Sequence, residues 1–188
     1  LIVGLLILFL ISSCSEDTRF ILRSSDKTGV DFENRLISSP NQNILNYIYF
    51  YNGAGVTLAD LNNDSLPDLI MAANQKIPQL YINKGGLKFK EAPLPTLPDG
   101  CNNGISVGDV NGDGWLDLYI ARVASDSVPE VHNALLVHQG LKKNGDPIFE
   151  EQAATYGLDF RGLSTHSSFF DYDLDGDLDL YLLNHSVN

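Results

Sequence analysis

One nine-residue pattern of acidic and amide side chains occurs three times in this chain, and a leucine follows each copy. The copies span residues 60–68, 109–117 and 171–179. Positions 1, 5 and 9 are always aspartate, and position 3 is aspartate or asparagine. The copies begin roughly 50 to 60 residues apart, a period that suits a four-stranded repeat unit and is too long for a leucine-rich or ankyrin unit. The chain is therefore expected to be an array of similar units packed on one another.

Short apolar runs of strand character flank every copy of the pattern. They precede it at 55–59, 104–108 and 167–170, and they follow it at 69–72, 118–121 and 180–183. Such runs, rich in Val, Ile, Tyr and Leu and bounded by Gly and Asp, are typical of strands. Further strand pairs are expected at 79–82 with 87–90 and at 134–137 with 148–150. Each unit thus offers four strands, and the sequence predicts an all-β protein, a partial β-propeller of four-stranded blades with calcium-binding loops.

The repeated pattern places oxygen ligands where a calcium ion needs them. Calcium takes about six to eight oxygens at ~2.3–2.6 Å. Side chains at positions 1, 3 and 5 of a tight loop can converge, and a backbone carbonyl at position 7 with a carboxylate at position 9 can complete the shell. Position 6 must turn sharply, which favours glycine. The expected ligands are Asp60, Asn62, Asp64 and Asp68, then Asp109, Asn111, Asp113 and Asp117, then Asp171, Asp173, Asp175 and Asp179.

These loops have two other interpretations. A solvated turn is one, since Asp, Asn and Gly are the usual turn residues, but three copies with the same spacing favour the metal. An EF-hand is the other, but it needs Glu at position 12, where this chain has Met71, Ile120 and Leu182. Counting carboxylates and glycines predicts that the third loop binds calcium most tightly and the first, with Ser65 at position 6, most weakly.

The three loops resemble those of the FG-GAP and VCBS repeat family, whose calcium loops occur in integrin-α-type β-propellers. Residues 47–56 and 170–185 are similar to bacterial lipoproteins of this family, which often carry an ASPIC/UnbV region that is not present here. The resemblance covers most of residues 18–188 and implies a calcium-binding propeller, but says little about its ligand. Because the sequence begins with Leu1 and stops at Asn188 soon after a strand-like run, a fragment is expected.

The N-terminus has the pattern of a lipoprotein leader. An apolar run from Leu1 to Ile11 is too short to span a membrane, which takes ~20 residues, and suits a signal peptide. Ile11-Ser12-Ser13-Cys14 resembles a bacterial lipobox. We therefore expect a signal peptide at 1–13, a lipidated Cys14 opening a tether at 14–17, and the propeller at 18–188. A plain secretory leader with a chance cysteine is the alternative.

The residues after Cys14 and the overall charge bear on location and partners. Ser15-Glu16-Asp17 resembles the acidic export tag of some Gram-negative lineages, which predicts an outer-membrane lipoprotein exposed at the cell surface. The net charge of -12 opposes binding to nucleic acid. With two cysteines there is no disulfide framework to interpret.

The sequence leaves three functions open. The first is a binding or adhesion module for a glycan or protein ligand. The second is an enzyme on a propeller scaffold, such as a calcium-dependent polysaccharide lyase or hydrolase. The third is a spacer in a larger outer-membrane complex. Fold alone does not choose among them. The 12 Lys and Arg residues form no visible cluster, which favours binding.

Three further features of the sequence give weaker indications of structure or function. The four histidines show no recognised metal-ligand spacing and are interpreted as ordinary loop or strand residues. The aromatic run 47–51 predicts a strand with a packed aromatic face, with a sugar-stacking surface as the alternative. Residues 18–34 resemble 149–160 and are expected to form an outer strand that pairs with the last blade of the ring.

Overall fold

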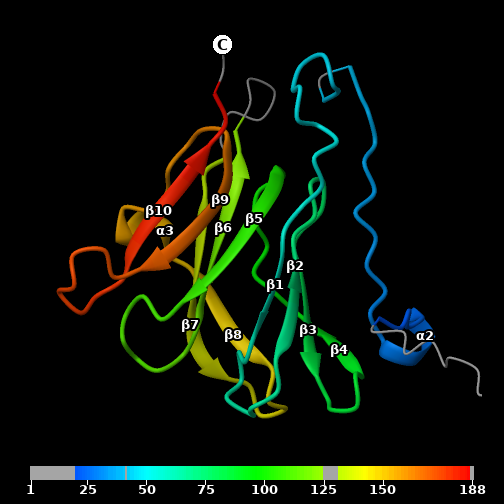
Figure 1. Ribbon diagram of the computed structural model, residues 1–188, viewed down its shortest axis with the longest axis vertical. Coiled ribbons are helices and arrows are strands. Elements are labelled where there is room, and N and C mark those ends of the chain that lie inside the picture. The colour runs from blue at the N-terminus through cyan, green and yellow to red at the C-terminus, as the bar shows by residue number, and fades with distance from the viewer. Residues whose placement is uncertain (1–19, 41, 125–130, 187–188) are drawn as a thin grey trace, which may run out of the picture.

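The computed structural model of the protein describes residues 20–40, 42–124 and 131–186. Antiparallel strands dominate it, arranged as two four-stranded sheets and one two-stranded sheet (Figure 1). In each sheet the strands follow one another in chain order, as in a meander. The expected all-β fold with four-stranded antiparallel sheets, consistent with propeller blades, is confirmed.

The sheets contain the following elements. The first has β1 (Val56–Ala59), β2 (Asp68–Met71), β3 (Gln79–Asn83) and β4 (Phe89–Ala92). The second has β5 (Cys101–Gly108), β6 (Asp117–Val123), β7 (Ala134–Leu141) and β8 (Pro147–Glu151). The third has β9 (Ser164–Phe170) and β10 (Asp179–Asn184). Two one-turn helices, α2 (Ser25–Thr28) and α3 (Ala153–Tyr156), complete the described elements.

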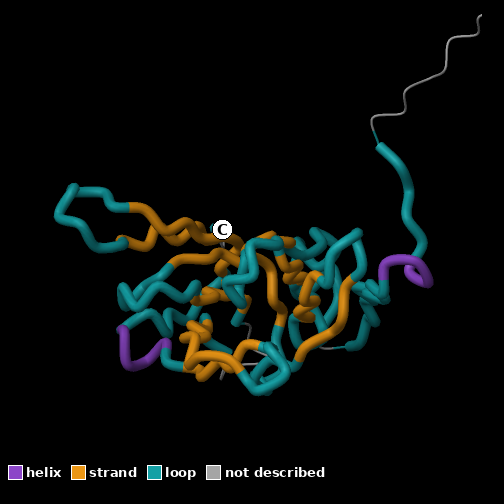
Figure 2. The backbone as a smooth tube through the Cα atoms, turned by 90° about the horizontal axis from the view of Figure 1, so that it is seen from below, coloured by secondary structure: helices purple, strands orange, loops and turns teal. Residues whose placement is uncertain are grey.

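The first strand of each sheet lies against the first strand of the next. β5 contacts both β1 and β9, so the sheets are set side by side around these strands (Figure 2). Glycine makes the close approach possible on both sides of β5. The Gly55 N–H donates to the Asn103 carbonyl at 2.5 Å. A Cβ on Gly104 would stand 2.6 Å from the Thr165 carbonyl oxygen, so no larger residue fits there without a shift.

The apolar core is divided between the sheets. Alternate residues of a strand point to opposite faces, so β6 sends Leu118 and Ile120 toward the first sheet and Tyr119 toward the third. Every residue of β6 is buried because sheets cover both of its faces. This packing places the connections β1–β2, β5–β6 and β9–β10 at one end of the molecule, away from the C-terminus (Figure 1).

The expected strand at residues 47–51 is wrong. Residues 44–46 and 48–51 form turns, with the Phe50 N–H donating to the Tyr47 carbonyl at 3.0 Å. Residues 47–51 take part in none of the strand pairings of the described residues. Instead Tyr49 stacks on His185, with ring centroids 3.6 Å apart. Local alternation predicted a sheet face, but tertiary contacts to the end of β10 determine the conformation.

The expected outer strand at residues 18–34 is absent from the described part of that segment. Residues 20–34 contain α2 and no strand. The two segments do share a one-turn helix that the sequence did not predict: Gly29 ends α2 at φ 77°, and Gly157 ends α3 at φ 68°. The following chain runs along the first sheet, where the side chains of Asn34 and Asn74 hydrogen-bond each other at 2.8 Å.

The expected leader, residues 1–13, the tether at 14–17 and Cys14 lie outside the described residues. Among the residues that are described, the helices are too short to cross a membrane.

Candidate metal loops

All three Asp-rich segments are the connections between the first and second strands of their sheets, and their backbones fold alike. The aspartate at position 1 accepts hydrogen bonds from the N–H groups at positions 5 and 6. Asp60 accepts them from Asp64 at 3.1 Å and Ser65 at 2.7 Å. Asp109 and Asp171 do the same in the second and third loops. Short polar side chains that bond their own backbone in this way are the reason that Asp occupies such turns.

Positions 4 and 6 of every loop have left-handed backbone. At position 6 the φ angles are 67° for Ser65, 87° for Gly114 and 98° for Gly176, as the sequence predicted for a sharp turn. Position 4 was missed. It holds Asn63, Gly112 and Leu174 at φ 56°, 70° and 63°. Asn and Gly are common in this region of backbone conformation, but a leucine is strained there by about 1–2 kcal/mol. A leucine at position 4 therefore gave no indication in the sequence that the backbone is left-handed.

In the first two loops the aspartate at position 9 connects its loop to the third strand of its sheet. Asp68 is fully buried and accepts from the Leu61 N–H at 3.0 Å and from the Asn83 N–H in β3 at 2.8 Å. Burial raises the pKa of Asp68, and the two N–H bonds oppose that rise. The sequence predicted a ligand here and missed this structural role. A carboxylate has about four lone-pair directions, so two remain for a cation.

The second loop repeats this arrangement. Asp117 is fully buried and accepts from the Val110 N–H at 2.9 Å and from the His138 N–H in β7 at 2.8 Å. Burial raises its pKa as it does that of Asp68. In the third loop Asp179 accepts from the Tyr172 N–H at 2.8 Å, and it is less buried than its two counterparts.

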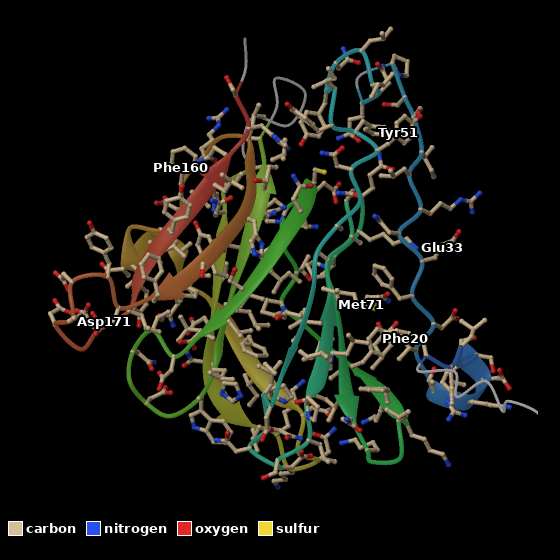
Figure 3. All side chains as sticks on the ribbon, in the orientation of Figure 1. Phe20, Glu33, Tyr51, Met71, Phe160 and Asp171 are labelled. Carbon is tan, nitrogen blue, oxygen red and sulfur yellow. The ribbon has the colours of Figure 1, made fainter. Side chains whose placement is uncertain are left out.

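The third loop brings carboxylates together. Asp171, Asp173 and Asp179 each offer an oxygen, and these oxygens lie within 4.8 Å of one another. Asp175, the fourth expected ligand, is not in that group, and its carboxylate accepts from the Asp177 N–H at 3.1 Å. A side-chain hydrogen bond between Asp177 and Asp175, together with the negative charge of the neighbouring carboxylates, raises the pKa of Asp177, a sign of the concentration of negative charge. Figure 3 shows Asp171 at the start of this loop, on the opposite side of the molecule from Tyr51.

The first and second loops relieve this charge with an amide. Asn62 donates to the Asp64 carboxylate at 3.0 Å, and Asn111 donates to Asp113 at 2.9 Å. The side-chain oxygens of Asn62 and Asn111 accept from the backbone N–H groups of Asp64 and Asp113. The turn otherwise has the same backbone geometry as in the third loop. The twelve expected ligand residues therefore sit in three equivalent loops, but the carboxylates converge most closely in the third.

The donor set of these loops fits a calcium ion. Every side-chain donor is a hard oxygen, which is the ligand type that calcium prefers. Across the described ranges, the one ion pair between side chains joins Lys90 to Asp146 and involves no loop aspartate. The carboxylates of the third loop thus approach one another without a cationic side chain to balance them, and a divalent cation would supply that balance.

His138 is the residue at this end of the molecule that sequence reasoning most clearly missed. Its side chain is buried, and its Nε2–H donates to the Leu61 carbonyl of the first loop at 3.0 Å, while Nδ1 accepts from the Gly140 N–H at 2.9 Å. Its ring stacks on Trp115, with centroids 4.6 Å apart. Burial lowers the pKa of His138. No spacing in the sequence pointed to this residue, because its partners come from two different sheets.

The chain was compared with known protein families and with curated proteins. Residues 60–120, which include the first two loops, match the model of a family described as FG-GAP-like repeat. The chain is 27% identical over 172 residues to integrin alpha-3 from Cricetulus griseus, covering 83% of this chain and 15% of that protein. It is 28% identical over 137 residues to human cartilage acidic protein 1, covering 69% of this chain and 20% of that protein. The chain therefore contains an FG-GAP-like repeat, has distant similarity to these proteins, and spans a fifth or less of their length.

Proposed function

We propose that this chain is a calcium-binding array of propeller blades in which each of the three loops holds one calcium ion. The observation that carries the proposal is the convergence of the Asp171, Asp173 and Asp179 oxygens without a cationic partner. In each loop the side chains at positions 1, 3, 5 and 9 and the backbone carbonyl at position 7 would hold the ion. Bound calcium would neutralise the carboxylates and fix the loop, since a cation that binds only the folded state stabilises it.

The array is proposed to serve as a binding or adhesion module for a glycan or protein ligand. The supporting features are the FG-GAP-like repeat at 60–120 and the similarity to integrin alpha-3. The enzyme alternative finds less support. Arg122, a buried cation that would suit an active site, donates instead to Asn102 Oδ1 and to the His132 and Pro98 carbonyls, so its hydrogen-bonding groups are used in holding the fold.

Lipid attachment at Cys14 and exposure at the outer-membrane surface are part of the same proposal and rest on the sequence alone. Mass spectrometry of the N-terminus extracted from membranes tests them. We expect acylation on Cys14 with residues 1–13 removed. An unmodified Cys14 preceded by an intact leader would overturn this part of the proposal.

Calorimetric titration of the metal-stripped protein tests calcium binding. We expect calcium to bind, magnesium to bind far more weakly, and Asp171→Ala to remove one binding event. Asp159→Ala is the matched control, because Asp159 is an exposed aspartate outside the loops. The absence of a calcium heat in the unmodified protein, or equal losses in the two variants, would overturn the proposal.

A further inference from the structure

The first and second loops are joined by an unbroken series of contacts that passes through His138. On one side, the His138 Nε2–H donates to the Leu61 carbonyl at 3.0 Å. Leu61 stands at position 2 of the first loop, and its own N–H donates to Asp68 at 3.0 Å. Both Leu61 and Asp68 are fully buried, so water does not compete for these bonds. The histidine thus holds the backbone of the first loop through a residue in contact with one of its proposed ligands.

On the other side, His138 holds the second loop at two points. Its backbone N–H donates to Asp117 at 2.8 Å, and its ring stacks on Trp115 with an angle of 6° between the planes. Asp117 is the position 9 ligand of the proposed site. Trp115 stands at position 7, whose carbonyl is the proposed backbone ligand. One side chain therefore contacts the frame of both loops.

A second contact joins the same two loops directly. The Asn63 amide donates to the Gly114 carbonyl at 3.4 Å. These two residues occupy the left-handed positions 4 and 6 of their loops, so each belongs to the turn that shapes its site.

We infer that His138 is a positioning residue that couples the first two loops, so that calcium in one raises the affinity of the other. This inference rests on the proposed calcium binding. Calcium in the first loop fixes the orientation of the Leu61 carbonyl, which fixes the His138 ring. A fixed ring holds Trp115 and Asp117 in place, so the second loop loses less conformational freedom when it binds its ion. Coupling between two sites typically changes the affinity of one site by a factor of about 5–150 when the other is occupied.

Trp115 provides the readout, because it is the protein's single tryptophan and stands in the second loop. Calcium is titrated into the metal-stripped protein while Trp115 fluorescence is followed. Asp64→Ala disables the first loop, and Asp175→Ala disables the third at the same position as a matched control. We expect Asp64→Ala to raise the Trp115 midpoint about fivefold or more, and Asp175→Ala to move it less than twofold.

Two variants of His138 assign the coupling to this residue. His138→Phe keeps an aromatic ring for Trp115 but loses the donor to Leu61, so in that background the effect of Asp64→Ala should fall below twofold. His138→Gln keeps an amide N–H near the Nε2 position but loses the ring that stacks on Trp115, so it should retain only part of the effect. If His138→Phe does not fold, the reduced effect in His138→Gln and the contrast between Asp64→Ala and Asp175→Ala still decide the matter.

Equilibrium dialysis with calcium separates the two possible failures. A protein that binds no calcium overturns the proposed function itself. A protein that binds calcium, loses one ion in Asp64→Ala, and shows an unchanged Trp115 midpoint keeps the proposed function and overturns the coupling. Equal midpoint shifts in Asp64→Ala and Asp175→Ala also overturn it, because they would reflect the general charge of the molecule.

Discussion

The carboxylate of Asp117 accepts a hydrogen bond from the backbone N–H of His138 at 2.8 Å, at the place where Asp68 accepts one from Asn83 in the preceding sheet. In the first two sheets the last aspartate of the repeated pattern therefore joins three parts: the start of its loop, the second strand that it opens, and the third strand. A residue expected only to bind a metal is also a structural part of the sheet. Stability and the proposed metal binding are consequently linked in these loops.

Replacing this aspartate should destabilise the protein even without metal. Asp117→Asn places an amide N–H against a backbone N–H, and an unsatisfied buried donor costs about 1–3 kcal/mol in the free energy of unfolding. Urea denaturation in a chelator measures this. Asp179→Asn is the matched control and should cost less, because Asp179 is only partly buried. Equal costs for the two variants would contradict the structural role.

Relieving the backbone at position 4 of the third loop should strengthen calcium binding there. Leu174 has φ 63° and is 86% exposed, so Leu174→Gly removes strain and loses little packing. We expect about a fivefold gain in calcium affinity, from about 1 kcal/mol of relieved strain. Calorimetric titration measures it. Asn63→Gly in the first loop is the control and should gain less, since asparagine tolerates this conformation. An unchanged affinity in Leu174→Gly would show that the empty loop already bears the strain.

Exchanging the residue at position 3 should move stability and affinity in opposite directions. Asp173→Asn gives the third loop the amide that donates to the neighbouring aspartate in the other two loops. In chelator, the variant should be more stable by about 0.5 kcal/mol, because one like charge is gone and one hydrogen bond is gained. Its calcium affinity should fall several-fold, since ligand charge tunes these sites. Thermal melts in chelator and calorimetry test the two effects, and Asn111→Asp should reverse both.

Acid should destabilise the protein in part through His138. Burial lowers its pKa below the ordinary value of 6.5, so the unfolded chain takes up this proton more readily than the folded one. The contribution is fully present above pH about 6.5 and is lost as the pH falls through the lower, folded-state pKa. Urea denaturation in chelator measures the free energy of unfolding from about pH 7.5 down to about pH 5. This free energy should fall less in His138→Gln than in the unmodified protein. His166→Gln, at an exposed position, is the control and should follow the unmodified protein.

Much of the fold follows from short-range patterns in the sequence. The strands β1–β4 and β5–β8 follow the predicted apolar runs, because alternation and glycine-bounded turns are local properties. The glycines and serine at position 6 have the left-handed backbone that the spacing required. The glycines shared by residues 20–34 and 149–160 occupy equivalent places, since Gly29 ends α2 and Gly157 ends α3.

Other features depended on contacts between distant parts of the chain. The Tyr47–Tyr51 segment has strand-like alternation, yet it forms turns because Tyr49 stacks on His185 rather than joining a sheet. The local strain at Leu174 follows from the fold of its loop and not from leucine's own preferences. Residues 20–34 contain α2 and no strand, although Gly29 lies against Phe89 in β4, the outer strand of the first sheet.

The sequence by itself determined the three loops, the spacing of their candidate oxygen ligands and the four-stranded unit, since the spacing of aspartates within nine residues is set by local chain geometry. Only the tertiary structure decided that Asp68 and Asp117 are buried as links to a third strand, and that His138 lies between two loops. Leu61 and His138 are 77 residues apart and belong to different sheets. Their contact exists because the sheets pack side by side, and no local pattern encodes that packing.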